Sequence, residues 1–284
     1  MKKLLKIKCP AKVNLTLDVV RRRNDGYHEL DMLMHTVKLF DILDISLDDS
    51  EETKITVSSD IGILPTDESN HCFKAAMLFL EAAKLKKNIS IDIKKNIPVA
   101  AGLGGGSSDA AGTLLALNKL CNAPLSELQL ADTAKKIGAD VPFFLYGGCM
   151  RARGIGEILS PVPSLTDAVF VVAKPQFGVS TPFVYKNLDL DKVDFHPDVA
   201  AAIAAIKQND LAELGKVSGN VLETVVLPIH PEIDEYKKIL IENGAVYSLM
   251  SGSGSSVFGV FDNAEYAGKA AARLKQHTKS VYIA

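Results

Sequence analysis

The feature that most constrains this chain is a glycine-rich segment at residues 98–111, with the sequence PVAAGLGGGSSDAA. Upstream of it, isoleucines at positions 89, 91 and 93 alternate with polar residues, which is typical of a half-buried strand. Downstream, an apolar run predicts a helix that ends near Asn122, with Pro124 as a stop signal. The segment therefore predicts a strand, a loop and a helix in succession, which a flexible linker would not give.

Glycines in such a loop allow a ligand to approach the backbone, because they lack a Cβ atom and reach positive φ angles. A helix that starts directly after the loop adds its unpaired N–H groups and the positive end of its dipole. We expect Ser107 or Ser108 to cap this helix, with Asp109 in its first turn. Together these features predict an anion site, and the usual anion is a phosphate group.

Two familiar phosphate-binding motifs are excluded. A P-loop needs a lysine after its last glycine, and none follows here. A dinucleotide fingerprint can be aligned on Gly102 and Gly104, but its third glycine position is Ser107. The chain therefore needs a phosphate-binding fold of another kind.

Composition excludes several other classes of protein. The formal net charge of −2 over 284 residues argues against nucleic acid as the main ligand. The densest basic cluster, residues 21–23, is read as a solvated turn, although a local anion contact stays open. Four scattered cysteines without metal-binding spacing predict reduced thiols in a reducing, cytoplasmic setting. No 18-residue apolar run predicts a membrane span, the N-terminus lacks the apolar stretch of a signal peptide, and no pattern predicts an oligomeric state.

The order of patterns predicts an α+β chain of two domains, residues 1–160 and 161–284. Strands are expected at residues 5–20, 29–39, 42–47 and 55–58, followed by a helix at 71–85. Residues 126–129 form a capping box for a helix that runs to Ile137, with Gly138 as its stop. The second half alternates strands and helices in the manner of a split βαβ unit.

Three separated segments, residues 10–15, 98–111 and 250–256, resemble the motifs of the GHMP kinase superfamily in kind and order. Residues 25–30, 138–144 and 178–182 resemble the motifs of one branch of this superfamily, which acts on 4-diphosphocytidyl-2-C-methyl-D-erythritol. The Asp-Gly-Tyr-His run at residues 25–28 separates that branch from homoserine, mevalonate and galactose kinases. The resemblance covers essentially the whole chain. It implies an N-terminal domain similar to ribosomal S5 domain 2 and a ferredoxin-like C-terminal domain.

The resemblance also implies the activity: ATP-dependent phosphorylation of the 2-hydroxyl of that CDP-linked small molecule, in the non-mevalonate route to isoprenoid precursors. Another GHMP kinase, of the homoserine or mevalonate type, is the alternative within enzymes. A non-catalytic ATP-binding regulator is the alternative outside them. An RNA-binding protein, suggested by the S5-like domain, is disfavoured by the near-neutral charge.

The matching positions imply roles for individual residues. Asp140 resembles the catalytic aspartate and Lys12 its partner lysine. Tyr27 and His28 resemble a cytosine-binding pair, and Tyr185 resembles a second aromatic that would sandwich the base, unless a shifted register gives that role to Phe183. The residues expected to contact the acceptor are Asn14, Tyr27, His28, Thr181 and Tyr185.

The ATP phosphates are expected on the glycine-rich segment, and residues 251–255 are expected to close over the site. Mg²⁺ is inferred from ATP chemistry, with Ser108 as a conceivable ligand and no acidic pair whose spacing demands a metal. The residues expected to bind ATP are Pro98, Val99, Ala100, Ala101, Gly102, Leu103, Gly104, Gly105, Gly106, Ser107 and Ser108.

Overall fold

The structure is a computed structural model that describes residues 2–284. They form two compact units: unit 1 contains residues 2–11, 40–97 and 104–146, and unit 2 contains residues 12–39, 98–103 and 147–284. The residues of the two units alternate along the sequence, because strands β1 (Lys3–Arg22) and β2 (His28–Asp49) each contribute residues to both units. The sequence patterns divide the chain once, into residues 1–160 and 161–284, and that division stays a prediction.

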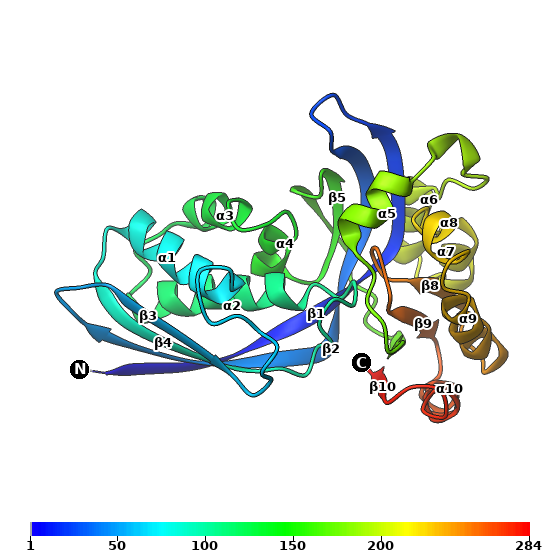
Figure 1. The fold of residues 1–284 in the computed structure, drawn as a ribbon. Coiled ribbons are helices and arrows are strands. Elements are labelled where there is room, and N and C mark those ends of the chain that lie inside the picture. The colour runs from blue at the N-terminus through cyan, green and yellow to red at the C-terminus, as the bar shows by residue number, and fades with distance from the viewer. Residues whose placement is uncertain (1) are drawn as a thin grey trace. The chain divides into compact units, whose positions relative to one another are not determined.

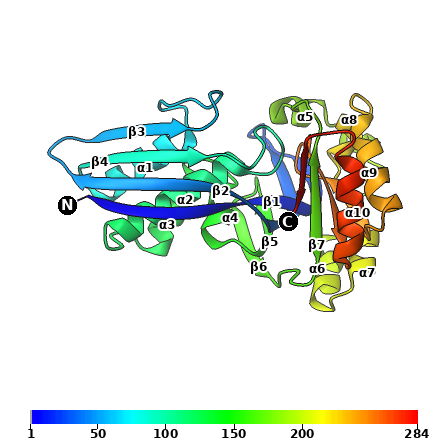
Figure 2. The same cartoon turned by 90° about the horizontal axis from the view of Figure 1, so that it is seen from below.

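Unit 1 has a layer of strands with helices on one face, as Figure 2 shows from below. Strand β4 pairs in parallel with β3 and antiparallel with the second part of β2. Helix α1 connects β3 to β4, and α2 packs beside α1 (Figure 1). The elements that unit 1 adds to β1 and β2 are β3 (Lys54–Ser59), α1 (His71–Ala83), β4 (Lys87–Lys94), α2 (Gly105–Leu120), α3 (Glu127–Lys135) and α4 (Val141–Tyr146).

Alternation along β4 explains how unit 1 builds its core. Ile89, Ile91 and Ile93 are all buried, whereas the polar residues between them are exposed, as their spacing predicts. Burial of each such side chain contributes about 1.5–3 kcal/mol of transfer free energy. The strand before the glycine-rich segment is therefore firmly anchored in unit 1.

Helix α2 begins earlier than the sequence suggested. Its N-cap is Gly104, at φ +71°, and not Ser107 or Ser108. The left-handed conformation of Gly104 turns the chain directly into the helix, which a residue with a Cβ atom would adopt only at a cost. Ser107 and Ser108 consequently lie within the first turn, and Ser108 is buried.

Other local predictions have mixed outcomes. The capping box of Ser126 and Gln129 is confirmed, although α3 ends at Lys135 rather than Ile137. The separate strands expected at 29–39 and 42–47 are wrong, because β2 runs without a break from His28 to Asp49. Helix α4 and the antiparallel strands β5 (Cys149–Gly154) and β6 (Ile158–Val162) were not expected at all.

Unit 2 contains a four-stranded antiparallel sheet in the order β10-β7-β9-β8. Helices α9 and α10 pack against it (Figures 1 and 2). This order confirms the split βαβ arrangement. The bounds are β7 (Val169–Lys174), β8 (Tyr247–Met250), β9 (Val257–Phe261), β10 (Ser280–Ile283), α9 (Glu232–Glu242) and α10 (Ala264–Leu274).

The rest of unit 2 comprises the first part of β2 paired with β5, and a run of short helices after β7. These are α5 (Thr181–Asn187), a 3₁₀ turn at Leu190–Lys192, α6 (Val199–Lys207), α7 (Leu211–Val217) and α8 (Glu223–Val226). Within residues 2–284, no helix is both long and apolar enough to cross a membrane.

Candidate active site

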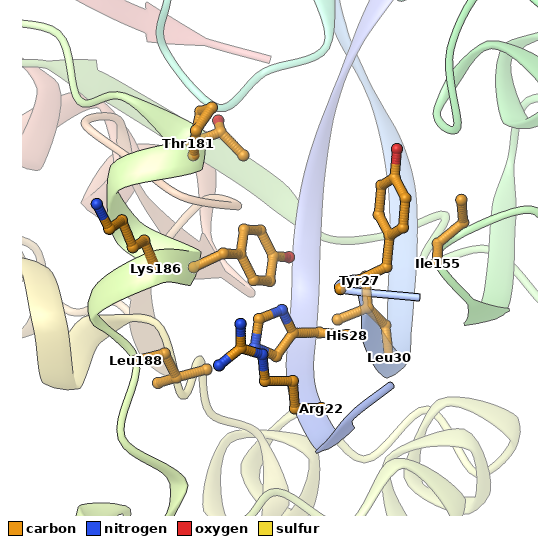
Figure 3. Close-up of a pocket in the computed structure, with 11 residues that line it drawn as sticks. Arg22, Tyr27, His28, Leu30, Ile155, Thr181, Lys186 and Leu188 are labelled. Carbon is orange, nitrogen blue, oxygen red and sulfur yellow. The ribbon is translucent and has the colours of Figure 1, made fainter. Parts of the chain in front are cut away.

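A cavity of about 670 Å³ opens in unit 2 between the hairpin that joins β1 to β2 and helix α5 (Figure 3). It combines aromatic, apolar and cationic side chains. Its lining residues are Arg22, Gly26, Tyr27, His28, Leu30, Ile155, Thr181, Pro182, Tyr185, Lys186 and Leu188. The cavity therefore brings together four of the five residues expected to contact the acceptor.

The hairpin turn presents Tyr27 and His28. Gly26 adopts φ +87°, and the Asp25 carboxylate accepts a hydrogen bond of 3.1 Å from the Tyr27 N–H. Arg23 pairs with Asp25 and Glu29, which helps to hold the turn. The basic cluster at 21–23 is thus divided in function, since Arg23 is structural whereas Arg22 lines the cavity.

His28 and Tyr185 form an aromatic pair in the cavity, with ring centroids 5.2 Å apart and planes tilted by 34°. Figure 3 shows the Arg22 guanidinium beside the His28 ring. Partial burial and then the charge of Arg22 lower the pKa of His28, so the ring is neutral near pH 7 and offers one donor and one acceptor nitrogen. Phe183 is exposed, and Tyr185 rather than Phe183 lines the cavity.

Lys12 and Asn14 lie buried on β1, also in unit 2. Lys12 Nζ donates a hydrogen bond of 2.6 Å to Asn14 Oδ1. The loop of residues 251–256, called here the serine loop, passes directly over this pair. A Cβ atom built on Gly252 would lie 3.3 Å from Lys12 Nζ and 3.4 Å from Asn14 Oδ1, so a side chain at this position would crowd both groups.

The serine loop also contacts the first half of the glycine-rich segment, Pro98–Leu103. Ser251 Oγ donates to the Gly102 carbonyl at 3.0 Å, and the Ser256 N–H donates to the Ala101 carbonyl at 3.2 Å. Gly102 has φ +73°, and a Cβ atom there would lie 2.1 Å from the Ser251 carbonyl oxygen. A side chain at position 102 is therefore incompatible with this packing.

Thr181 joins the same loop to the cavity. Its hydroxyl lies 2.6 Å from Ser253 Oγ, and its side chain lines the cavity. The neighbours of the serine loop thus include Lys12, Asn14, Gly102 and Thr181. This arrangement connects the predicted phosphate segment to the predicted acceptor residues within one compact unit.

The second half of the glycine-rich segment begins α2 in unit 1. Its N-cap is Gly104, which has no side chain to accept the N–H groups of the first turn, and these groups have no acceptor within the helix. Ser108 Oγ is buried and has no hydrogen-bond partner in the described part of the chain. An anion at this helix end, or a hard cation carried by it, would satisfy these groups.

A buried charge cluster of Lys95, Asp41 and Asp109 lies under the first turn of α2. Lys95 Nζ donates to Asp41 and, at 2.9 Å, to Asp109 Oδ2. Asp41 Oδ1 accepts backbone N–H groups from Asn96 at 2.6 Å and Ile97 at 2.8 Å. Burial raises the pKa of Asp109 to about 7, against the opposing charge of Lys95. Nothing in the residue spacing had pointed to this cluster.

Asp140 precedes α4 in unit 1, where Val141 follows it in the core. It lies in a different unit from Lys12, and the pairing of the two stays a prediction. Across residues 2–284, no three or more His, Cys, Asp and Glu side chains form a group able to hold a metal ion.

With this geometry in place, comparisons with known proteins assign the family. The family model of the GHMP kinases N terminal domain matches residues 70–148, and that of the GHMP kinases C terminal matches residues 202–280. The chain belongs to the GHMP kinase family. Its mixed helices and sheets are the GHMP kinase fold with N- and C-terminal domains.

Relatives of this GHMP kinase are named 4-diphosphocytidyl-2-C-methyl-D-erythritol kinase. One from Alkaliphilus metalliredigens is 44% identical, covering 92% of this chain and 89% of the relative. One from Caldicellulosiruptor bescii is also 44% identical, covering 98% and 97%. A crystal structure of 4-(cytidine 5'-diphospho)-2C-methyl-D-erythritol kinase matches with a TM-score of 0.82 and 37% identity, over 98% of both chains.

A homoserine kinase structure from Cytophaga hutchinsonii matches with a TM-score of 0.80 but only 23% identity, over 100% of this chain and 95% of that one. At that identity the likeness concerns the fold alone. The chain therefore belongs, within the GHMP kinases, to the branch of the 44% identical relatives.

Proposed function

We propose that this protein is an ATP-dependent kinase that phosphorylates the 2-hydroxyl of 4-diphosphocytidyl-2-C-methyl-D-erythritol, in the cytoplasm. The observation that carries the proposal is the unit 2 cavity, where the His28–Tyr185 pair lies near two cations, Arg22 and Lys186. Aromatic rings hold nucleobases by stacking, and cations hold phosphate oxygens. A cavity of this chemistry suits a cytidine diphosphate, the group that the relatives' name specifies.

In this proposal the cytosine edge is read by neutral His28, which supplies a donor and an acceptor at once. The base stacks on Tyr185 or Tyr27. A base between the His28 and Tyr185 rings needs about 7 Å, two contact distances, which exceeds the 5.2 Å between them. The base therefore does not stack between these two rings, in agreement with His28 binding its edge. Asn14 and Thr181 contact the diphosphate or the polyol.

The donor side uses the glycine-rich segment. Residues 98–108 bind ATP, with the backbone N–H groups of Gly102–Ser108 on its phosphates, and the buried Ser108 hydroxyl would provide an oxygen ligand for accompanying Mg²⁺. When bound, ATP supplies the phosphoryl group and Mg²⁺ neutralises phosphate charge. The chain's own part is to orient the phosphates and to exclude water from them.

Two residues carry the chemistry. Asp140 accepts the proton of the 2-hydroxyl as the acceptor oxygen forms its bond to the γ-phosphorus and the bond from that phosphorus to the leaving ADP oxygen breaks. Lys12, an ammonium group buried beside the serine loop, keeps Asp140 ionised and stabilises the charge on the transferred group. The cost of burying Lys12 is compensated in part by its hydrogen bond to Asn14.

The deciding experiment measures ADP release by purified protein with ATP and the CDP-linked acceptor. Turnover should require that acceptor, and homoserine, mevalonate and the methylerythritol phosphate without CMP should give none. Asp140→Asn should lower turnover by about 10² or more, the scale of general base catalysis, and should leave ATP binding nearly intact.

Asp132→Asn is the matched control, because Asp132 is an exposed carboxylate of the same unit that pairs only with Lys135 at 3.4 Å among the ion pairs of the described residues. This variant should keep full turnover. Equal rates with an acceptor that lacks cytidine would assign the protein to another GHMP kinase activity. ATP binding without any turnover would indicate a regulator instead.

A further inference from the structure

The segment at residues 219–223 connects to the serine loop through side chains that no sequence pattern singled out. Its backbone is fixed to β1: the Leu17 N–H donates to the Gly219 carbonyl at 2.8 Å, and the Val221 N–H donates to the Leu17 carbonyl at 3.1 Å. The Thr16 hydroxyl also bonds the Gly219 carbonyl, at 3.1 Å. Asn220, between these anchors, is therefore mounted on the strand that also carries Lys12 and Asn14.

From this mount, the Asn220 side chain reaches the start of the serine loop. Its Nδ2 atom donates to the Met250 carbonyl at 2.7 Å and to the Gly252 carbonyl at 2.8 Å. Its Oδ1 atom accepts the Leu222 N–H at 3.0 Å, which fixes the orientation of the amide. Asn220 is buried, so these bonds are shielded from competition with water.

Glu223 binds the other backbone polar group of Met250, its N–H. Its Oε1 atom accepts the Met250 N–H at 2.7 Å, and its Oε2 atom pairs with Lys237 of α9. Both backbone polar groups of Met250, the last residue of β8, are thus bound by side chains of the 220–223 segment. The loop leaves β8 in a direction that these two residues determine.

That direction matters because the next residues of the loop contact the site. Ser251 binds the Gly102 carbonyl, and a Cβ atom built on Gly252 would lie 3.3 Å from Lys12 Nζ and 3.4 Å from Asn14 Oδ1. A movement of Gly252 by about 1 Å would therefore change how closely the loop backbone approaches these two side chains. Placement errors of this size cost about 10²-fold in rate in other enzymes.

We propose that Asn220 and Glu223 are positioning residues, which set the serine loop against Gly102 and Lys12 and so fix the part of the kinase site that unit 2 supplies. The inference rests on the proposed function for its kinetic consequence, and on hydrogen bonds within unit 2 for its structural one. Neither residue touches the acceptor cavity, whose lining is contributed by other parts of the unit.

The test uses Asn220→Ala in the full chain, with Asn243→Ala as matched control. Asn243 lies in unit 2 and its Nδ2 atom also donates a 2.7 Å bond to a carbonyl, that of Ile239 at the end of α9. Amide hydrogen exchange, read by mass spectrometry, should be at least tenfold faster at residues 250–256 in Asn220→Ala and unchanged there in Asn243→Ala. The kcat should fall at least tenfold in the first variant only, with less than threefold change in KM for the acceptor.

Glu223 gives an independent test should Asn220→Ala fail to fold. Glu223→Gln keeps an acceptor for the Met250 N–H, and burial already raises the pKa of the Glu223 carboxyl, which favours a neutral group there. Glu223→Gln should therefore keep exchange and kcat within threefold of wild type, whereas Glu223→Ala should lose both. Equal behaviour of the Gln and Ala variants would overturn the inference for Glu223.

Unchanged loop exchange in folded Asn220→Ala, or an equal loss of kcat in Asn243→Ala, would overturn the inference for Asn220. Failure of the proposed function gives a different result, namely a wild-type protein that does not turn over the CDP-linked acceptor. In that case the exchange data alone decide whether these residues position the loop.

Discussion

The two halves of the glycine-rich segment are held by different kinds of interaction. In unit 1, the start of α2 lies on the buried ions Lys95, Asp41 and Asp109. In unit 2, the half at Pro98–Leu103 is held by neutral bonds from the Lys12 N–H, the Ser251 hydroxyl and the Ser256 N–H to three successive carbonyls. One half therefore depends on charge and the other on the path of the backbone.

The difference has energetic consequences. A neutral hydrogen bond contributes about 0.5–1.5 kcal/mol net, and its loss is tolerated when neighbours remain. Removing one partner of a buried ion cluster costs about 3–5 kcal/mol, because the remaining charge is left without compensation. The charged half should thus be the more fragile to mutation and to pH, and the neutral half should fail gradually.

The largest effect is expected from Lys95→Met. This change leaves Asp41 and Asp109 buried without their cation, so the free energy of unfolding should fall by about 3–5 kcal/mol in urea titrations. Lys87→Met is the control on the same strand region, because its partner Asp49 is 79% exposed. That variant should lose about 0–1 kcal/mol. Equal losses in the two variants would mean that the cluster does not support α2.

Sequence patterns predicted local features of the chain and missed the long-range contacts that hold both halves of the glycine-rich segment. Period-two burial of β4, the capping box at Ser126 and the motif at residues 98–111 are local, so spacing alone reveals them. The Lys95 cluster joins residues 54 and 14 positions apart, and Asn220 reaches Met250 over 30 positions. Such contacts depend on strand pairing and loop paths, which no local pattern contains.

The same limit explains the errors. The expected break at residues 40–41 falls inside β2, because this strand pairs with β5 before the break and with β4 after it. The start of α2 was misplaced because the left-handed Gly104 turns the chain into the helix without any side-chain cap. Asn14, Thr181 and Tyr185 were found through family likeness, and the structure gives them a common setting in unit 2.

A pH titration should separate the two halves further. Burial raises the pKa of Asp109 to about 7 in the folded chain, from a usual 3.8, so between pH 4 and 7 the folded chain binds more protons than the unfolded chain. Stability should therefore fall as pH rises through this window, by up to about 1.4 kcal/mol per pH unit. Asp109→Asn should remove this slope, as measured by urea midpoints at several pH values.

The control for that titration is Asn118→Ala on the same helix. Asn118 does not titrate and binds the Leu125 backbone through both atoms of its amide, each at 3.0 Å. Its loss should lower stability by a similar amount at every pH, leaving the slope intact. A slope that survives in Asp109→Asn would place its origin in another group of the protein.

The smallest effect is expected from Ser251→Ala, which removes the hydroxyl bond to the Gly102 carbonyl. Stability should fall by about 0.5–1.5 kcal/mol, and by the same amount at pH 5 and pH 8, because no charge is involved. Ser248→Ala removes an equivalent hydroxyl bond of 2.9 Å, to the Phe258 carbonyl within the sheet. Both variants should lose similar stability, yet only Ser251→Ala should raise the KM for ATP, by about twofold to fivefold. A pH-dependent loss in Ser251→Ala would show that charge also governs the unit 2 half, and the distinction between the halves would then fail.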